Sequence, residues 1–147
     1  MALAPQFDIQ HHQIVALAQD RRFGIGTSTT EETIAAAVVT AARMLGTPLV
    51  IVFTKSGFSA RMVSSHRPGV PILALTDVPR TYNQLALVWG VVPLLVPPAD
   101  TYEKMLQSAR EALLERGLAR EGDKVIVTAG VPFDVPGTTN LLKIETV

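Results

Sequence analysis

The sequence predicts an α/β protein, a three-layer α/β/α sandwich on a mostly parallel five-stranded sheet whose last strand is antiparallel. Helical segments alternate with apolar segments from residue 30 onward, which is typical of parallel sheets covered by helices. The apolar segments are continuous rather than alternating, as expected of strands buried on both faces. The final connection has no helix, and a loop of its length favours an antiparallel return.

The composition indicates a folded domain without a general affinity for polyanions. The chain has 147 residues, of which 48% are hydrophobic and 18% are charged, so one domain with a substantial core is expected. Thirteen basic residues balance thirteen acidic ones, which argues against nucleic-acid and membrane-surface partners. The absence of cysteine excludes disulfides and cysteine-bound zinc. With no signal-peptide pattern at the start, we expect a cytoplasmic protein.

Two regions are expected: an N-terminal helical or linker segment over 1–26, and the α/β domain over 27–147. The domain opens with a helix from residue 30, for which Thr29 and Glu32 form a capping box. Gly46 and Pro48 end this helix. Its predicted buried stripe, spaced as one helix face, consists of Ile34, Ala37, Val38, Ala41, Ala42 and Leu45.

The remaining elements follow in alternation. Asp77 is the expected N-cap of the second long helix, and Asp100 with Glu103 the expected start of the third. The predicted strands cover 48–53, 70–76, 91–96, 124–130 and 140–147. The predicted later helices cover 59–66, 78–90 and 100–116.

The stretch "LVIVFTKSGFSARMV" (49–63) crowds polar residues where a buried strand meets a helix. Ligands bind at the carboxyl ends of parallel strands, and helix N-termini attract anions. Hydroxyls from Thr54, Ser56 and Ser59, the charge of Lys55, and close approach of a ligand at Gly57 would together suit a phosphate. Plain capping by Ser and Thr explains the same residues, and the local pattern leaves both interpretations open.

Other conspicuous residues have simpler explanations. His11 and His12 are adjacent, without the i, i+4 spacing of a helical metal site, so no metal ligands are expected. Trp89 ends a predicted helix, and we expect it to be a packing residue rather than a ligand platform. Ser64, Ser65 and His66 are consecutive, which is the wrong geometry for a catalytic triad.

Most of the chain resembles a known family. The stretches that carry the resemblance are "TEETIAAAVVTAARMLGTPLVIVFTKSGFSARMVSSHRPGVPILALT", "QLALVWGVVPLLV", "GDKVIVTAGVP" and "PGTTNLLKIETV". In this order and spacing they resemble the C-terminal, allosteric domain of pyruvate kinase over roughly residues 27–147.

The resemblance implies that the catalytic reaction belongs to a different domain of the family enzyme. The family enzyme, which acts in glycolysis, transfers phosphoryl from phosphoenolpyruvate to ADP with magnesium and usually potassium, in a (β/α)8 barrel. The charged groups that such chemistry requires around the transferring phosphoryl group are missing here. We therefore expect no catalytic residues and no cofactor in this chain, and no activity from it alone. If it is a fragment, the missing barrel domain is its partner.

The resemblance also implies an effector site. In the family a Thr-x-Ser-Gly-x-Ser loop holds a phosphate of the effector, and the loop before the last strand closes over it. The second loop here lacks arginine and carries Asp134, which would repel a second phosphate, so we favour a sugar monophosphate or AMP over a bisphosphate. The effector residues implied are Thr54, Lys55, Ser56, Gly57, Phe58 and Ser59, with Gly137 and Thr138 in the second loop.

Finally, the family assembles through its C-terminal domains, which implies a homo-oligomer. The edge strand 140–147 and the helix 78–90 are the expected interface elements, although Lys143 and Glu145 would equally protect a free edge. Two alternatives stay open. The first is a stand-alone relative that acts as a small-ligand sensor or a small enzyme, and the second is a purely oligomerising domain with a degenerate loop.

Overall fold

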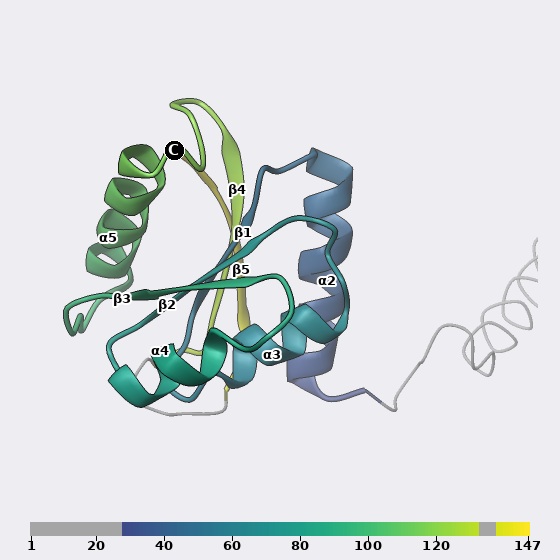
Figure 1. The fold of residues 1–147 in the computed structure, drawn as a ribbon. Coiled ribbons are helices and arrows are strands. Elements are labelled where there is room, and N and C mark those ends of the chain that lie inside the picture. The colour runs from purple at the N-terminus through teal and green to yellow at the C-terminus, as the bar shows by residue number, and fades with distance from the viewer. Residues whose placement is uncertain (1–27, 133–137) are drawn as a thin grey trace, which may run out of the picture.

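A five-stranded mixed sheet forms the centre of the domain. The computed structural model describes residues 28–132 and 138–147, so the predicted segment 1–26 lies outside the described residues. The strand order is β3-β2-β1-β4-β5 (Figure 1). The strands are β1 Val50–Phe53, β2 Ile72–Thr76, β3 Val91–Leu95, β4 Lys124–Ala129 and β5 Leu141–Thr146.

The pairing confirms the predicted mixed sheet. β1 lies in the middle and pairs in parallel with β2 and β4, with Val50 opposite both Ile72 and Ile126. β2 in turn pairs in parallel with β3. β5 is antiparallel to β4, with Ile126 opposite Ile144, as the connection without a helix predicts.

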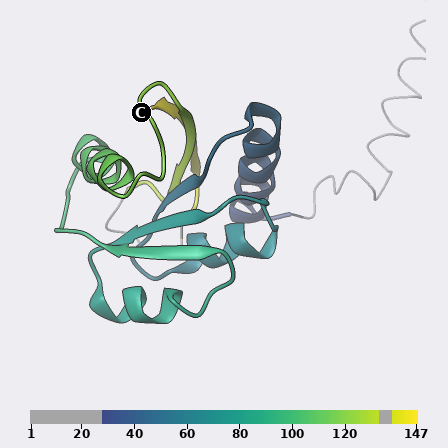
Figure 2. The same ribbon diagram turned by 45° about the horizontal axis from the view of Figure 1, so that its top comes forward.

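Helices cover both faces of the sheet, which confirms the three-layer sandwich. On one face lie α2 Thr30–Leu45, α3 Phe58–Ser65 and α4 Pro79–Leu85, and on the other lies α5 Tyr102–Glu115 (Figures 1 and 2). Each helical layer packs on its own set of strand side chains. The sheet therefore separates two hydrophobic clusters.

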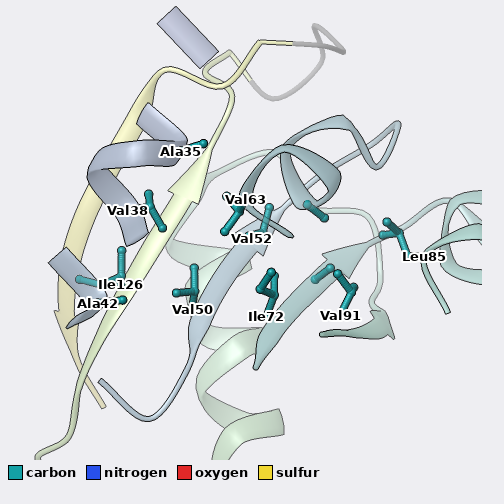
Figure 3. Packing of buried hydrophobic residues seen from close by; sticks show 12 residues of the cluster. Ala35, Val38, Ala42, Val50, Val52, Val63, Ile72, Leu85, Val91 and Ile126 are labelled. Carbon is teal, nitrogen blue, oxygen red and sulfur yellow. The ribbon is translucent and has the colours of Figure 1, made fainter. Parts of the chain in front are cut away.

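Residue alternation along β1 assigns side chains to these clusters. Val50 and Val52 face the α2 side, where Val38 and Val63 meet them (Figure 3). Ile51 and its alternate neighbours face α5 instead. All four residues of β1 are buried, so the centre of the sheet is closed to solvent from both sides.

The start of α2 is as predicted, whereas its buried stripe is partly wrong. The Thr29 amide donates to Glu32 Oε2 at 2.9 Å, and the Glu32 amide donates to Thr29 Oγ1 at 3.2 Å. Ala37 is exposed and Leu45 is 41% exposed, although both belong to the predicted stripe. The run of alanines offers several equivalent faces, so hydrophobic periodicity left the rotation of the helix undetermined. The residues buried are Ala35, Val38, Val39 and Ala42.

Two predicted N-caps are wrong. Val78 rather than Asp77 caps α4, and its amide donates to Thr76 Oγ1 at 3.2 Å. Thr101 rather than Asp100 caps α5, with Thr101 Oγ1 accepting from the Lys104 amide at 3.3 Å. Both aspartates instead form ion pairs with lysines. Because α4 ends at Leu85, the predicted helix 78–90 is also too long.

Trp89 does not pack as predicted. Its side chain is 70% exposed, and the Arg67 guanidinium lies over the ring, 4.9 Å from the centroid. Leu87, two residues earlier, is 91% exposed. In the part of the chain that the structure describes, no helix is long and apolar enough to cross a membrane.

A charged cluster joins α5 to the edge strand β5. Tyr102 donates a hydrogen bond to Glu145 Oε1 at 2.9 Å, and Lys143 Nζ lies 2.8 Å from the same oxygen. Burial alone would raise the pKa of Glu145, but the bonds from Lys143 and Tyr102 outweigh it, and the pKa is lowered. Burial, followed by the bond to Glu145, raises the pKa of Tyr102.

We therefore predict that Glu145→Gln lowers the free energy of unfolding by about 1 kcal/mol at pH 7. The folded pKa lies below the usual value, so the carboxylate stabilises the fold above pH 4.5 and loses this effect as pH falls through the folded pKa. Urea unfolding at several pH values measures the difference between wild type and variant. Glu121→Gln, an exposed glutamate in a turn, is the control. A difference that persists undiminished at pH 3 contradicts the prediction.

Candidate functional site

The loop 54–59 lies at the carboxyl edge of the parallel strands, where the sequence predicts a site. It leaves β1 and enters α3, next to the segments that follow β2, β3 and β4. A cavity opens at this edge, where ligands bind in open α/β sheets. The polar and glycine residues that line it are Thr54, Lys55, Ser56, Ser59, Thr76, Asp77, Ser108, Gly130 and Thr138.

Two hydroxyls of the loop cap its own backbone. Thr54 Oγ1 accepts from the Gly57 amide at 2.8 Å, and Ser56 Oγ accepts from the Phe58 amide at 3.3 Å. A hydroxyl that accepts in this way keeps its own hydrogen for a further acceptor. Both hydroxyls also belong to residues that line the cavity. Capping and ligand binding, which the sequence presents as alternatives, are therefore compatible at Thr54 and Ser56.

Gly57 packs closely against α4. It is buried, with φ of +85°, and a Cβ placed there would lie 3.2 Å from Leu85 Cδ2 and 3.4 Å from Thr81 Cγ2. The glycine thus permits a left-handed turn and close packing against α4. Gly57 does not line the cavity, so close approach of a ligand to its backbone stays a prediction without structural support. Any anion site at this loop depends on the neighbouring residues instead.

Lys55 is held by two contacts from the segment after β2. Its Nζ forms an ion pair with Asp77 Oδ2, and its carbonyl accepts from Thr81 Oγ1 at 2.7 Å. The Lys55 side chain keeps 35% exposure, compared with 13% for Asp77. The charge that the sequence assigns to a phosphate is thus already balanced by a carboxylate in the same cavity.

Ser59 connects the loop to the segment preceding β5. The Ser59 and Thr139 hydroxyls share a hydrogen bond, and both residues are buried. Thr138 lines the cavity, whereas Gly137 lies outside the described residues. Phe58 is 36% exposed and does not line the cavity.

The cavity described above, called the inner pocket from here on, adjoins a second, more open hollow. The inner pocket is about 40 Å³, which is room for roughly three water molecules at about 10–15 Å³ each. An open hollow of about 820 Å³ adjoins it and shares Lys55 and Ala99 as walls. This outer hollow is also lined by Pro98, Asp100, Lys104, Val131 and Pro132. A small anionic group suits the inner pocket, and the rest of a ligand suits the hollow.

Sequence reasoning missed the residues that complete the site from distant segments. A Cβ on Gly130 would lie 1.5 Å from the Thr138 carbonyl oxygen, so only glycine lets these segments touch. Asn140 also joins the segment after β4 to the segment before β5, because its Oδ1 accepts from the Val131 amide at 2.8 Å. The position of Asp77 directly after a strand is a signal for the site, but its position before a helix equally predicts an N-cap. Within 28–132 and 138–147 no three acidic or histidine side chains gather as metal ligands.

Comparisons with known proteins identify similar chains. Residues 32–145 match the family model described as the pyruvate kinase alpha/beta domain. A pyruvate kinase from Agrobacterium vitis is 42% identical over 116 residues, which are 79% of this chain and 24% of that protein. One from Geobacillus stearothermophilus is 33% identical over 147 residues, covering 100% of this chain and 24% of that protein. The chain thus spans about a quarter of these relatives' length.

We predict that Gly57→Ala destabilises the fold by about 2–3 kcal/mol, through left-handed strain plus crowding against Leu85. Gly122→Ala is the matched control, because Gly122 has φ of +89° with nothing within 4 Å of a Cβ. It is expected to cost about 1 kcal/mol, the strain alone. Thermal and urea unfolding measure both variants. Equal losses would show that packing against α4 is not what requires the glycine.

Proposed function

Because this chain belongs to the pyruvate kinase C-terminal α/β domain family, we propose that it is a regulatory, effector-binding domain. The observation that carries the proposal is the cavity at the carboxyl edge of the sheet, lined by hydroxyls of the loop 54–59. The loop continues into α3, whose N-cap glycine provides no capping side chain. Hydroxyl hydrogens and the helix dipole there favour an anion.

The proposed effector is a phosphate monoester, either a sugar phosphate or an AMP-like nucleotide. Its phosphate would occupy the inner pocket and contact Thr54, Lys55, Ser56 and Ser59. The inner pocket is too small for a sugar as well, so the remainder would lie in the adjoining hollow. Hollows of a few hundred to about 1,000 Å³ are usual for small-molecule ligands.

We place catalysis elsewhere in the assembled enzyme. Phosphoryl transfer from phosphoenolpyruvate to ADP, with its magnesium and potassium, would belong to a barrel domain that these 147 residues do not supply. The chain alone would then bind an effector without turning over substrate. Such an enzyme would act in the cytoplasm, where we place this protein.

The internal pairing of the loop favours one alternative. Groups of the protein itself already form hydrogen bonds with Thr54 and Ser56 and an ion pair with Lys55. A purely oligomerising domain with a degenerate loop would show such internal pairing. The regulatory proposal needs these same groups to serve a ligand too. Binding measurements separate the two.

We predict that the 147-residue chain binds ribose 5-phosphate, glucose 6-phosphate or AMP in titration calorimetry, and that Ser56→Ala weakens this binding by about tenfold. Its stability is expected to stay near wild type, because Ser56 is exposed. Ser65→Ala, an exposed serine at the far end of α3, is the control. Failure of all three ligands to bind wild type would favour the oligomerising alternative.

Ser59→Ala is less suitable as a binding test. It would leave the buried Thr139 hydroxyl without its partner, which costs about 1–3 kcal/mol. A loss of binding in that variant would therefore mix a local effect on the ligand with a change in the segment before β5.

The proposed homo-oligomer interface combines the edge strand β5 with the segment 78–90. Among the described strands β5 pairs only with β4, so its other edge is open. Ile144 on this strand is 49% exposed, and Leu87 and Trp89 are exposed large side chains of the second segment. The segment 78–90 leads into β3, so the two elements present exposed apolar side chains at opposite edges of the sheet, and each could support association.

We predict that Ile144→Lys weakens self-association by about tenfold or more, because dimerisation would bury a charge. Leu95→Lys is the comparison variant, because Leu95 is 47% exposed and lies on β3, which follows the segment 78–90 at the opposite edge of the sheet. Sedimentation velocity over a concentration series measures both variants. An Ile144→Lys variant that associates as tightly as wild type, or a wild-type chain that stays monomeric, would contradict an interface at β5.

A further inference from the structure

The inner pocket contains two ionisable side chains, and their charges cancel. Among the residues described as lining it, only Lys55 and Asp77 are ionisable, and they form an ion pair with each other. A site that holds a dianion by charge alone would instead have a positive excess. The pocket therefore depends on hydrogen-bond donors and on a lysine shared with a carboxylate.

Neighbouring contacts leave the Asp77 carboxylate to Lys55 and fix the backbone of the lysine. The Val78 amide is satisfied by Thr76 Oγ1, so the Asp77 carboxylate is not needed at the start of α4. Thr81 is buried and donates to the Lys55 carbonyl, which ties the lysine backbone to α4. At 13% exposure, the Asp77 carboxylate is largely withdrawn from solvent yet lines the pocket.

The adjoining hollow provides no compensating charge among the described residues. Its remaining lysine, Lys104, pairs with Asp100 at 2.7 Å between Nζ and Oδ1. Lys55 is common to both compartments and is the lysine already paired with Asp77. A ligand with two phosphates would thus meet two ion pairs and no unpaired cation among the described residues that line the two compartments.

We propose that Asp77 is a specificity-determining residue that restricts the site to ligands with one phosphate and neighbouring hydroxyl groups. Lys55 bridges the Asp77 carboxylate and the phosphate, and Asp77, which is paired with the lysine common to both compartments, repels a further anionic group near that lysine. A carboxylate accepts several hydrogen bonds, so Asp77 can accept from a ligand hydroxyl while paired with Lys55. This inference rests on the proposed function and adds which phosphate esters the site accepts.

Fructose 6-phosphate and fructose 1,6-bisphosphate test the proposal, because they differ by one phosphate. Titration calorimetry with the 147-residue chain gives the ratio of the two Kd values. Wild type is expected to bind the monophosphate more tightly. Asp77→Asn keeps the side-chain shape and removes the charge, and we expect it to shift the ratio toward the bisphosphate by about tenfold or more.

Asp123→Asn is the matched control, because it removes the same charge just before β4, from a residue that lines neither the inner pocket nor the adjoining hollow. It is expected to leave the ratio within about twofold of wild type, as screened surface charges do. Asp77→Ser provides a second, independent substitution if the asparagine variant unfolds. Thermal unfolding of each variant confirms that a folded protein is being titrated.

The outcomes distinguish the inference from the proposed function. If wild type binds both esters and Asp77→Asn leaves their ratio unchanged, Asp77 does not determine specificity although the effector site is real. If wild type prefers the bisphosphate, the inference is also overturned. If neither ester, ribose 5-phosphate nor AMP binds wild type, the effector site itself is refuted, and the role of Asp77 with it.

Discussion

The central position of β1 is the constraint on which the rest of the structure depends. This strand is paired on both edges and buried on both faces, so the chain that leaves it must turn at once toward a helical layer. The turn is made at Gly57, whose left-handed conformation brings α3 back over the sheet. Polar groups of the loop 54–59 are thereby held at the carboxyl edge, beside the ends of β2 and β4. Burial of an apolar strand thus positions the polar residues of the candidate site.

Internal pairing of those polar residues changes how an anion would be bound. Each of Thr54, Ser56 and Lys55 has a partner within the protein, and the pocket carries no net charge among the described residues. An anion would gain hydrogen bonds without a large Coulombic attraction, so geometry would matter more than charge. A polar site of this kind discriminates between ligands because a wrong ligand leaves a polar group without a partner or brings a repelled charge into the site. That behaviour suits a site that must respond to one metabolite among many phosphorylated ones.

The strands, their mixed pairing and the capping box of α2 could be predicted because they depend on local sequence or on continuous apolar runs. The residues that were misassigned depend on contacts between distant segments. Asp77 precedes a helix and resembles an N-cap, but its partner Lys55 lies 22 positions away. Gly57 resembles a ligand-approach glycine, but the atoms that require it belong to α4. Trp89 ends a predicted helix, yet it is exposed to solvent, and its ring is in contact with the Arg67 guanidinium rather than with the core. Local patterns identified which loop carries the candidate site, and they did not identify its tertiary partners.

The same tertiary partners suggest how an effector signal would leave the site. A ligand that draws Lys55 away from Asp77 changes a contact with the segment that leads into α4. A ligand that competes for the Ser59 hydroxyl changes a contact with Thr139, two residues before β5. These two segments are also the proposed interface elements. Effector binding and self-association of the chain would therefore depend on the same contacts. Thermodynamic reciprocity then requires that association alter effector affinity by the factor with which the effector alters association. An effector site whose groups were all free for the ligand would have no such link, so under the proposed function the internal pairing would couple the site to the interface as well as stabilise the loop.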